Sequence, residues 1–236
     1  MIRRYPVKSM KGEDLSEVFV SYGGLRGDRV YAFMDETNTS NFPWMTARQI
    51  SELLLYKPRF TKKFDISKEY PDMSEYALEV GTPEGKIWNI RDPEFEKHLE
   101  QKFSKPIHLR FSEKGMWDSR PVSFFSLDTL KELEKEASIN LDHKRFRANF
   151  YVKWDNDEPF FEDTLVGKTL QLGEKLKIMI SKKDLRCVII TYDPDTTEKN
   201  PAILIHIATR HENCAGVYGV VLQEGVAKKM DSIFVL

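Results

Sequence analysis

The sequence predicts a mixed α+β protein that is mostly β and has few helices. Short segments rich in β-branched and aromatic residues recur through the first ninety residues and again after Phe146, with glycines and prolines between them. Two longer segments, both between residues 92 and 138, space their apolar residues as amphipathic helices do. Many short strands with few helices favour a β-barrel-like or mixed architecture. The 236 residues suit one large domain or two small domains packed together.

The first ninety residues are predicted to contain strands and turns. Two strand candidates, Glu17–Val20 and Arg29–Met34, lie on either side of a glycine pair. Further along, Tyr76–Val80 and Lys86–Ile90 flank the loop Gly81–Gly85. Because a glycine-containing loop joins two short β-rich runs there, we expect the two runs to pair as a hairpin.

Two helices are predicted in the middle of the chain. The first begins at Asp92, a capping residue, and Pro93 follows at the first helical position. The second runs from about Ser126, also a capping residue, to Ala137. The apolar stripes are formed by Phe95, Leu99 and Phe103 in the first helix and by Leu127, Leu130 and Leu133 in the second.

Strands are expected to dominate again after Phe146. Asn200 and Pro201 are typical of a helix start, so one short helix through Ile203 and Ile207 is predicted among these strands. The strand candidates are Phe150–Val152, Leu170–Leu172, Leu176–Ile180, Cys187–Tyr192, Val217–Leu222 and Ile233–Leu236.

Charge and hydropathy exclude several classes of protein. The chain carries 36 Lys and Arg against 37 Asp and Glu, a net charge of −1, whereas general nucleic-acid binding needs a basic excess. No apolar run reaches the roughly 18 residues of a membrane span, and the N-terminal residues lack a signal peptide's apolar stretch. We therefore expect a cytoplasmic protein with no nucleic-acid or membrane partner. Rossmann, P-loop, hydrolase-elbow and zincin motifs are missing from the sequence.

Composition also limits the metal sites. Two cysteines, Cys187 and Cys214, are too few for a disulfide framework, a four-cysteine zinc site or an iron–sulfur cluster. The five histidines show no metal-ligand spacing. In particular, His206 and His211 are five residues apart, so we do not expect them to share a helix face.

Cys187 is the sharpest candidate for chemistry. It follows Arg186 and lies close in sequence to Lys182 and Lys183. Neighbouring cations favour the thiolate form of cysteine, which binds soft metals and acts as a nucleophile. The alternative is that Cys187 is a small buried apolar residue at the start of a strand. Cys214 is interpreted as structural.

Basic and polar residues occur near turns in several segments. Lysine, arginine, serine and asparagine are the side chains that hold phosphate oxygens, so a shared anion site is one interpretation. Solvated surface charge is the other, because the segments are distant in sequence. The candidates are Lys8, Ser9, Arg29, Arg48, Ser119, Arg120, Arg147 and Asn149.

Taken in order, these segments resemble the MOSC-domain proteins, named after the molybdenum cofactor sulfurase C-terminal domain. The chain looks most like the branch that contains the mitochondrial amidoxime reducing component and its bacterial relatives. The N-terminal matches are YPVKSMKG at Tyr5–Gly12, GLRGDR at Gly24–Arg29 and TARQ at Thr46–Gln49. The C-terminal matches are FRAN at Phe146–Asn149, FFEDTLVGKTLQLG at Phe160–Gly173, RCVIITYDPDT at Arg186–Thr196 and YGVVLQEG at Tyr218–Gly225.

The resemblance implies a MOSC N-terminal β-barrel-like domain over residues 1–90 and a MOSC β-barrel domain over residues 91–236, with helical linker segments at about 92–138. It also implies a molybdenum-cofactor oxidoreductase that reduces small N-hydroxylated or N-oxygenated compounds with electrons from a separate donor protein. Cys187 would be the catalytic residue and the molybdenum ligand. Descriptions of the family add pyridoxal phosphate binding. The implied cofactor-binding residues are Lys8, Ser9, Arg29, Ser119, Arg120, Arg147, Asn149 and Arg186.

Three departures from the family pattern keep other functions open. Ala148 stands where the family has proline, and Leu185 stands where a small polar residue precedes the RC pair. Val220 and Val221 replace polar or aromatic side chains. One alternative is a molybdenum-cofactor carrier, or a sulfur-transfer protein that bears a persulfide on Cys187. Another is a member that has lost the cofactor and binds a small anionic ligand.

Overall fold

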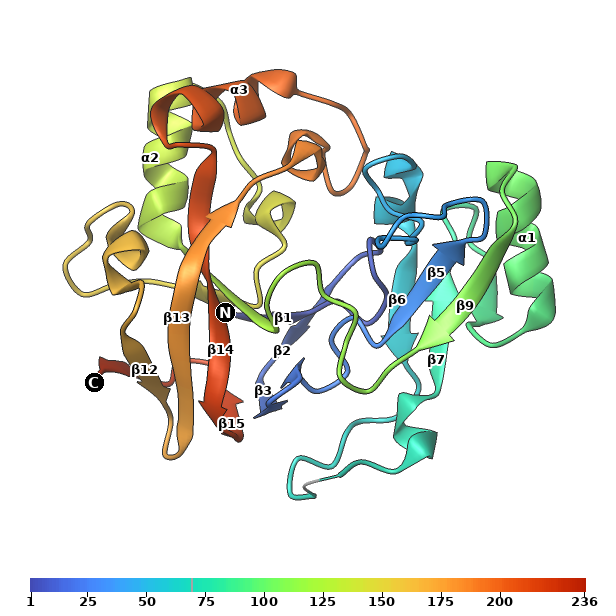
Figure 1. Ribbon diagram of the computed structural model, residues 1–236, viewed down its shortest axis with the longest axis horizontal. Coiled ribbons are helices and arrows are strands. Elements are labelled where there is room, and N and C mark those ends of the chain that lie inside the picture. The colour runs from blue at the N-terminus through green and yellow to red at the C-terminus, as the bar shows by residue number, and fades with distance from the viewer. Residues whose placement is uncertain (69) are drawn as a thin grey trace. The chain divides into compact units, whose positions relative to one another are not determined.

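The elements of the protein fall into two units, each built from segments that are distant in sequence. The computed structural model describes residues 1–68 and 70–236 (Figure 1). The first unit contains residues 1–4, 14–26 and 118–236, and the second contains residues 5–13 and 27–117. The domain boundary expected between residues 90 and 91 stays a prediction.

An eight-stranded sheet is the framework of the first unit, and it curls into a half-barrel. The two longest strands, β13 and β14, pair antiparallel with three register shifts, which bend the pair along its length (Figure 1). β10 and β11 pair in parallel. In spatial order the strands are β16 (Ile233–Val235), β12 (Thr169–Leu172), β13 (Leu176–Leu185), β14 (Cys214–Gln223), β10 (Val122–Ser126), β11 (Phe150–Val152), β1 (Ile2–Arg4) and β2 (Glu13–Leu15).

A smaller sheet contributes to the core of the same unit. Its strands are β15 (Gly225–Lys228), β3 (Glu17–Ser21) and β4 (Gly24–Leu25), in that order. Side chains alternate along a strand, so every second residue of β13 between Leu176 and Ile180 is buried. Val18 and Val20 of β3 belong to the same buried cluster as these residues.

Two α-helices, α2 (Leu127–Ala137) and α3 (Pro201–Arg210), lie side by side in the first unit (Figure 1). Both begin as predicted, because the side chains of Ser126 and Asn200 each accept a hydrogen bond from a backbone N–H of the first turn. The buried cluster that they share includes Phe125, Leu133, Ile203, Ile207 and Ala215. Short 3₁₀ helices connect the strands at η3 (His143–Phe146), η4 (Phe161–Leu165) and η5 (Val188–Thr191).

The second unit contains two small antiparallel sheets and α1 (Pro93–Phe103). α1 begins at Asp92 and buries Phe95 and Leu99, as predicted. The expected hairpin is confirmed as the pairing of β7 with β8. The first sheet pairs β5 (Tyr31–Asp35) with β9 (Ile107–Phe111), and the second has the order β6 (Lys57–Phe60), β7 (Leu78–Gly81) and β8 (Ile87–Asn89). Two 3₁₀ helices, η1 (Ser51–Leu55) and η2 (Met73–Tyr76), lie in its loops.

The strand predicted at Cys187–Tyr192 is wrong, because this run contains η5. The backbone N–H of Ile190 donates to the carbonyl of Cys187 at 3.2 Å, and the hydroxyl of Thr191 donates to the carbonyl of Val188 at 2.7 Å. Local hydrogen bonds thus satisfy the chain while Ile190 is buried. An apolar, β-branched run forms a helical turn here because its packing outweighs its strand propensity.

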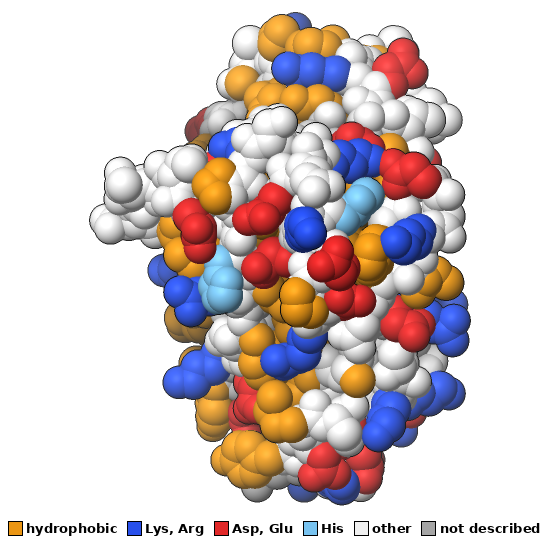
Figure 2. Space-filling model, turned by 90° about the vertical axis from the view of Figure 1, so that its right-hand side faces the viewer, with side chains coloured by type: hydrophobic (Ala, Val, Ile, Leu, Met, Phe, Trp, Pro, Cys, Tyr) orange, Lys and Arg blue, Asp and Glu red, His pale blue; other side chains and the backbone are white. Residues whose placement is uncertain are grey.

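The fold class is confirmed as mixed α+β and mostly β. Within the part of the chain that the structure describes, no helix is long and apolar enough to cross a membrane. Basic and acidic side chains are interspersed over the face shown in Figure 2, in keeping with the net charge of −1.

Candidate functional site

Cys187 lies in the short connection between β13 and η5, which we call the Cys187 turn (residues 184–187). β13 ends at Leu185, and Cys187 precedes the first residue of η5 with an extended backbone. Cys187 is half-buried, and neither it nor Cys214 forms a disulfide. Burial raises the pKa of the Cys214 thiol above its ordinary value. Cys187 is therefore neither a strand residue nor a fully buried one.

Arg186 anchors this turn. Its guanidinium forms a salt bridge with Asp184, and its Nη2 donates to the carbonyl oxygen of Phe146 at 2.5 Å. Its backbone N–H donates to the carbonyl of Asn213 at 2.8 Å. Burial lowers the pKa of Arg186, but Asp184, Tyr218 and Cys187 together raise it more, and the pKa lies above its ordinary value. Arg186 therefore keeps its positive charge, and its contacts with Asp184 and Phe146 hold the residue next to Cys187 in place.

The FRAN segment, residues 146–149, meets the Cys187 turn through Phe146. Besides accepting from Arg186, Phe146 presents its ring 5.2 Å from the Arg186 guanidinium carbon. Asn149 is only 1% exposed, and its Oδ1 accepts from both the backbone and the hydroxyl of Ser123 at 3.1 Å. Its Nδ2 donates to the carbonyl of Arg3 at 3.3 Å. Asn149 thus ties the segment to two strands of the sheet.

In the second unit, Lys8 and Arg29 meet at Met116. The Lys8 ammonium donates to the carbonyl of Met116 at 2.7 Å, and the backbone N–H of Met116 donates to the carbonyl of Arg29 at 2.8 Å. Arg29 also pairs with Asp28 at 2.5 Å and lies over the ring of Tyr5 at 4.8 Å. Two residues predicted to bind one cofactor therefore share Met116 as a contact within this unit, Lys8 through its side chain and Arg29 through its backbone.

Three of the predicted cofactor-binding residues have an unusual backbone conformation. The φ angles are +68° for Ser9, +52° for Arg29 and +53° for Arg147. Residues with a Cβ adopt this left-handed region at a cost, and such residues cluster at ligand-binding sites. Arg147 ends η3, where the left-handed conformation is common, but Ser9 and Arg29 lie outside any helix end. The two loops of the second unit therefore hold Ser9 and Arg29 in a conformation that non-glycine residues seldom adopt.

Ser119 and Arg120 lie in the loop before β10. Arg120 is exposed, and its guanidinium donates to the carbonyl of Ser119 at 3.0 Å. This hydrogen bond is local, and a role in cofactor binding stays a prediction for both residues.

The three departures from the family pattern fall at different kinds of position. Ala148 is buried, and its backbone N–H donates to the hydroxyl of Tyr151 at 3.1 Å, a bond that proline cannot make. Val221 belongs to the core of the first unit. Leu185 is 66% exposed. The departures at Ala148 and Val221 are therefore accommodated by hydrogen bonding and packing within this chain.

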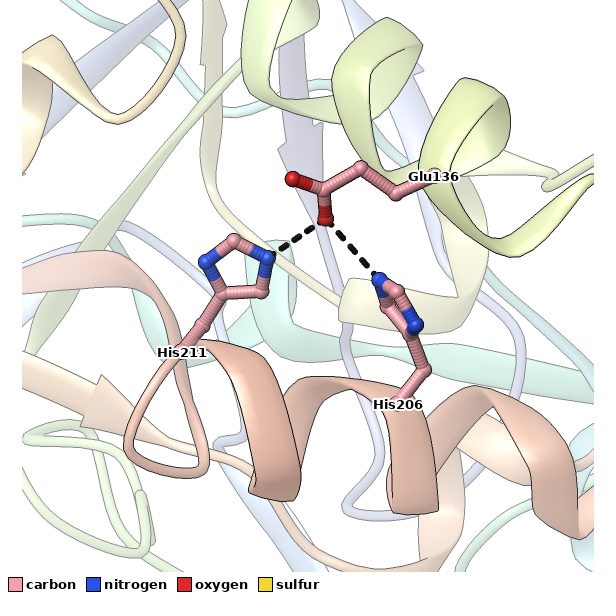
Figure 3. Close-up of side chains that lie close together, drawn as sticks. All are labelled: Glu136, His206 and His211. Atoms are coloured by element: carbon pink, nitrogen blue, oxygen red, sulfur yellow. Dashed lines mark hydrogen bonds and ion pairs between the residues drawn. The ribbon is translucent and has the colours of Figure 1, made fainter.

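A second polar site, not predicted from the sequence, is the histidine cluster (Glu136, His206 and His211). His206 and His211 do not share a helix face, as expected, yet their rings converge on one carboxylate. α3 ends at Arg210, and His211 leaves the helix with a φ of −130°, so helical spacing does not govern where its ring lies. Figure 3 shows both imidazoles directed at the carboxylate of Glu136.

The sequence profile of the MOSC domain matches residues 106–234, and that of the MOSC N-terminal beta barrel domain matches residues 1–98. No curated protein matches the chain. Among solved structures, the YUAD protein from Bacillus subtilis is similar, with a TM-score of 0.50, 12% identity, and coverage of 98% of this chain and 91% of that one. YiiM from Geobacillus stearothermophilus has a TM-score of 0.40 and 15% identity, over 50% of this chain and 54% of its own. At this identity the likeness to YUAD shows the fold alone.

Proposed function

Because the chain belongs to the MOSC-domain family, we propose that it binds the molybdenum cofactor and reduces N-hydroxylated or N-oxygenated compounds, with Cys187 as the molybdenum ligand. The family is associated with this cofactor. The observation that carries the proposal is the meeting of two segments forty residues apart, through the hydrogen bond from Arg186 to Phe146. The resemblance assigns both segments to the same cofactor.

The residues present fit such a cofactor by their chemistry. A cysteine thiolate is a soft ligand, and Cys187 is reachable because it is only half-buried and unpaired with Cys214. Nε of Arg186 is buried and lacks a hydrogen-bond partner among the described residues, so one donor next to Cys187 remains for a ligand. Lys8, Arg29 and Arg147 are cations of the kind that hold a phosphate group.

The chain's own residues would bind and orient. Cys187 would hold the metal, and Arg186 would position Cys187 through its contacts with Asp184 and Phe146. Lys8, Ser9 and Arg29 would each donate a hydrogen bond to phosphate oxygens. When bound, the cofactor supplies two-electron chemistry in which the N–O bond of the substrate breaks and two protons and two electrons yield N–H and water. A separate protein supplies those electrons.

Metal and pterin analysis tests the proposal directly. Protein made in a host that synthesises the cofactor should carry molybdenum and pterin and should reduce a hydroxylamine or an amidoxime. Cys187→Ala should lose both the molybdenum and the activity, whereas the matched variant Cys214→Ala should keep them. A Cys187→Ala protein with full molybdenum content and full activity would exclude this role for Cys187.

The half-buried, unpaired thiol of Cys187 also favours a second candidate function, the transfer of sulfur as a persulfide. Mass spectrometry of the intact protein distinguishes the two. An added sulfur atom that disappears on reduction and in Cys187→Ala, together with no turnover of hydroxylamines or amidoximes, would support sulfur transfer over reduction.

A further inference from the structure

The histidine cluster joins the ends of two helices in the first unit. Nε2 of His206 lies 2.9 Å from Oε2 of Glu136, and Nε2 of His211 lies 2.7 Å from the same oxygen (Figure 3). Glu136 belongs to α2, His206 belongs to α3, and His211 directly follows α3. The proposed reduction at Cys187 uses none of these three side chains.

The cluster is held in place and remains reachable from solvent. The ring of His211 stacks on Phe160, with centroids 4.2 Å apart, and the backbone N–H of His211 donates to the carbonyl of Ile207 at 2.9 Å. The side chains of His206, His211 and Glu136 are 18%, 16% and 30% exposed. Such partial burial limits rotamer freedom but leaves a path for a small ligand.

The donor set is one that divalent transition metals prefer. Two imidazole nitrogens and one carboxylate oxygen suit zinc and its neighbours, with metal–ligand distances of about 2.0–2.2 Å. The three donor atoms all lie within 4.8 Å of one another. Although burial raises the pKa of Glu136, hydrogen bonds from His206 and His211 lower it below its ordinary value, so the carboxylate is ionised at neutral pH.

We propose that Glu136, His206 and His211 form a binding site for one divalent transition-metal ion, with Nε2 of each histidine and the Glu136 carboxylate as ligands. The ion replaces the shared hydrogen bonds, each imidazole binds through a deprotonated Nε2, and water fills the remaining coordination positions. Because the ligands come from α2, from the middle of α3 and from the residue that follows α3, the ion cross-links these helices. This site is independent of the proposed function of Cys187.

Metal titration of the full-length protein tests the site. Chelator-treated protein should bind one Zn²⁺ per chain by calorimetry, and Co²⁺ should give visible ligand-field bands without the charge-transfer band of a thiolate. Glu136→Gln, His206→Gln and His211→Gln should each weaken Zn²⁺ binding by at least roughly tenfold to a hundredfold. Zn²⁺ should raise the melting temperature of the wild type and not that of these variants.

Two matched controls make the result decisive. His108→Gln removes a half-exposed histidine of the second unit, and it should bind Zn²⁺ as the wild type does. Cys187→Ser should also bind Zn²⁺ unchanged. The proposal is overturned if Zn²⁺ fails to bind, if binding survives Glu136→Gln and both histidine variants, or if it is lost in Cys187→Ser. Circular dichroism of the metal-free variants tests whether each is folded. If one histidine variant is unfolded, Glu136→Gln and the other histidine variant decide whether the cluster binds Zn²⁺.

Discussion

The Cys187 turn and the histidine cluster are both polar sites of the first unit, but they differ in burial. The side chains of Arg186 and Asp184 are 6% and 8% exposed, whereas those of the histidine cluster are 16–30% exposed. A buried charge that loses its partner is costly, while a partly exposed pair exchanges partners at little cost. The first site is therefore part of the fold, and the second is free to exchange its hydrogen bonds for a ligand.

The largest effect that this difference predicts is at Asp184. Asp184→Asn leaves the Arg186 charge buried without its carboxylate, so we expect the free energy of unfolding to fall by about 3–5 kcal/mol. Denaturant unfolding measures it. The matched variant Glu132→Gln breaks an exposed ion pair with Lys135 and should change stability by no more than about 0.5 kcal/mol. A loss below about 1 kcal/mol for Asp184→Asn would contradict the role of Arg186 as a buried anchor.

Asn149 should give the next largest effect. Asn149→Ala removes the acceptor of the buried backbone N–H of Ser123, and we expect a loss of about 1–3 kcal/mol in the free energy of unfolding. Asn156→Ala, at an exposed loop position, is the matched control and should stay within about 0.5 kcal/mol of the wild type. Equal stability of both variants would show that Asn149 is dispensable for the fold and leave it to a ligand alone.

Much of the fold is predictable from local signals, because these act over a few residues. Asp92, Ser126 and Asn200 cap the three α-helices as expected, and alternating burial accompanies the strands. The helical turn after Cys187 was not predictable, since its run of Val and Ile has strand propensity and only tertiary packing reverses it.

The candidate site, like the fold, has a part that local sequence motifs predict and a part that only tertiary contacts decide. Contiguous motifs identify the segments around Lys8, Arg147 and Cys187, but the sequence does not show that Arg186 is bound to Asp184 and Phe146. The histidine cluster escaped prediction because Glu136 lies 70 residues from His206. Convergence of distant residues depends on how helices pack, and no local pattern encodes it.

Glu162 differs from both sites, because it is a buried carboxylate whose hydrogen bonds come from neutral groups. Burial raises its pKa above the ordinary 4.5, more than the hydrogen bonds from Ser126 and Thr129 lower it. The folded protein thus holds this proton more tightly than the unfolded chain does. The resulting stability is present below pH 4.5 and is lost as the pH rises through the folded-state pKa.

The expected outcome is a pH-dependent gap between the wild type and Glu162→Gln. The free energy of unfolding of the wild type, minus that of the variant, should decrease as the pH rises from about 4 to about 8. Urea unfolding at several pH values measures it, and Glu132→Gln should show no such trend relative to the wild type. A gap that grows with pH would mean that Glu162 is stabilised as a carboxylate instead.

The smallest predicted effect concerns Phe160, which holds the ring of His211 in the exposed site. Phe160→Leu keeps an apolar side chain but removes the stacking contact at 4.2 Å. A ring pair of this kind contributes about 0.5 kcal/mol or somewhat more, so Zn²⁺ affinity should fall roughly two- to threefold, far less than when a ligand is removed. Calorimetric titration of chelator-treated protein measures the change, with Phe161→Leu as the neighbouring control. If Phe160→Leu abolished Zn²⁺ binding as completely as His211→Gln does, metal binding would require the stacked ring of Phe160. That result would contradict the view that the cluster exchanges its hydrogen bonds for a ligand at little cost.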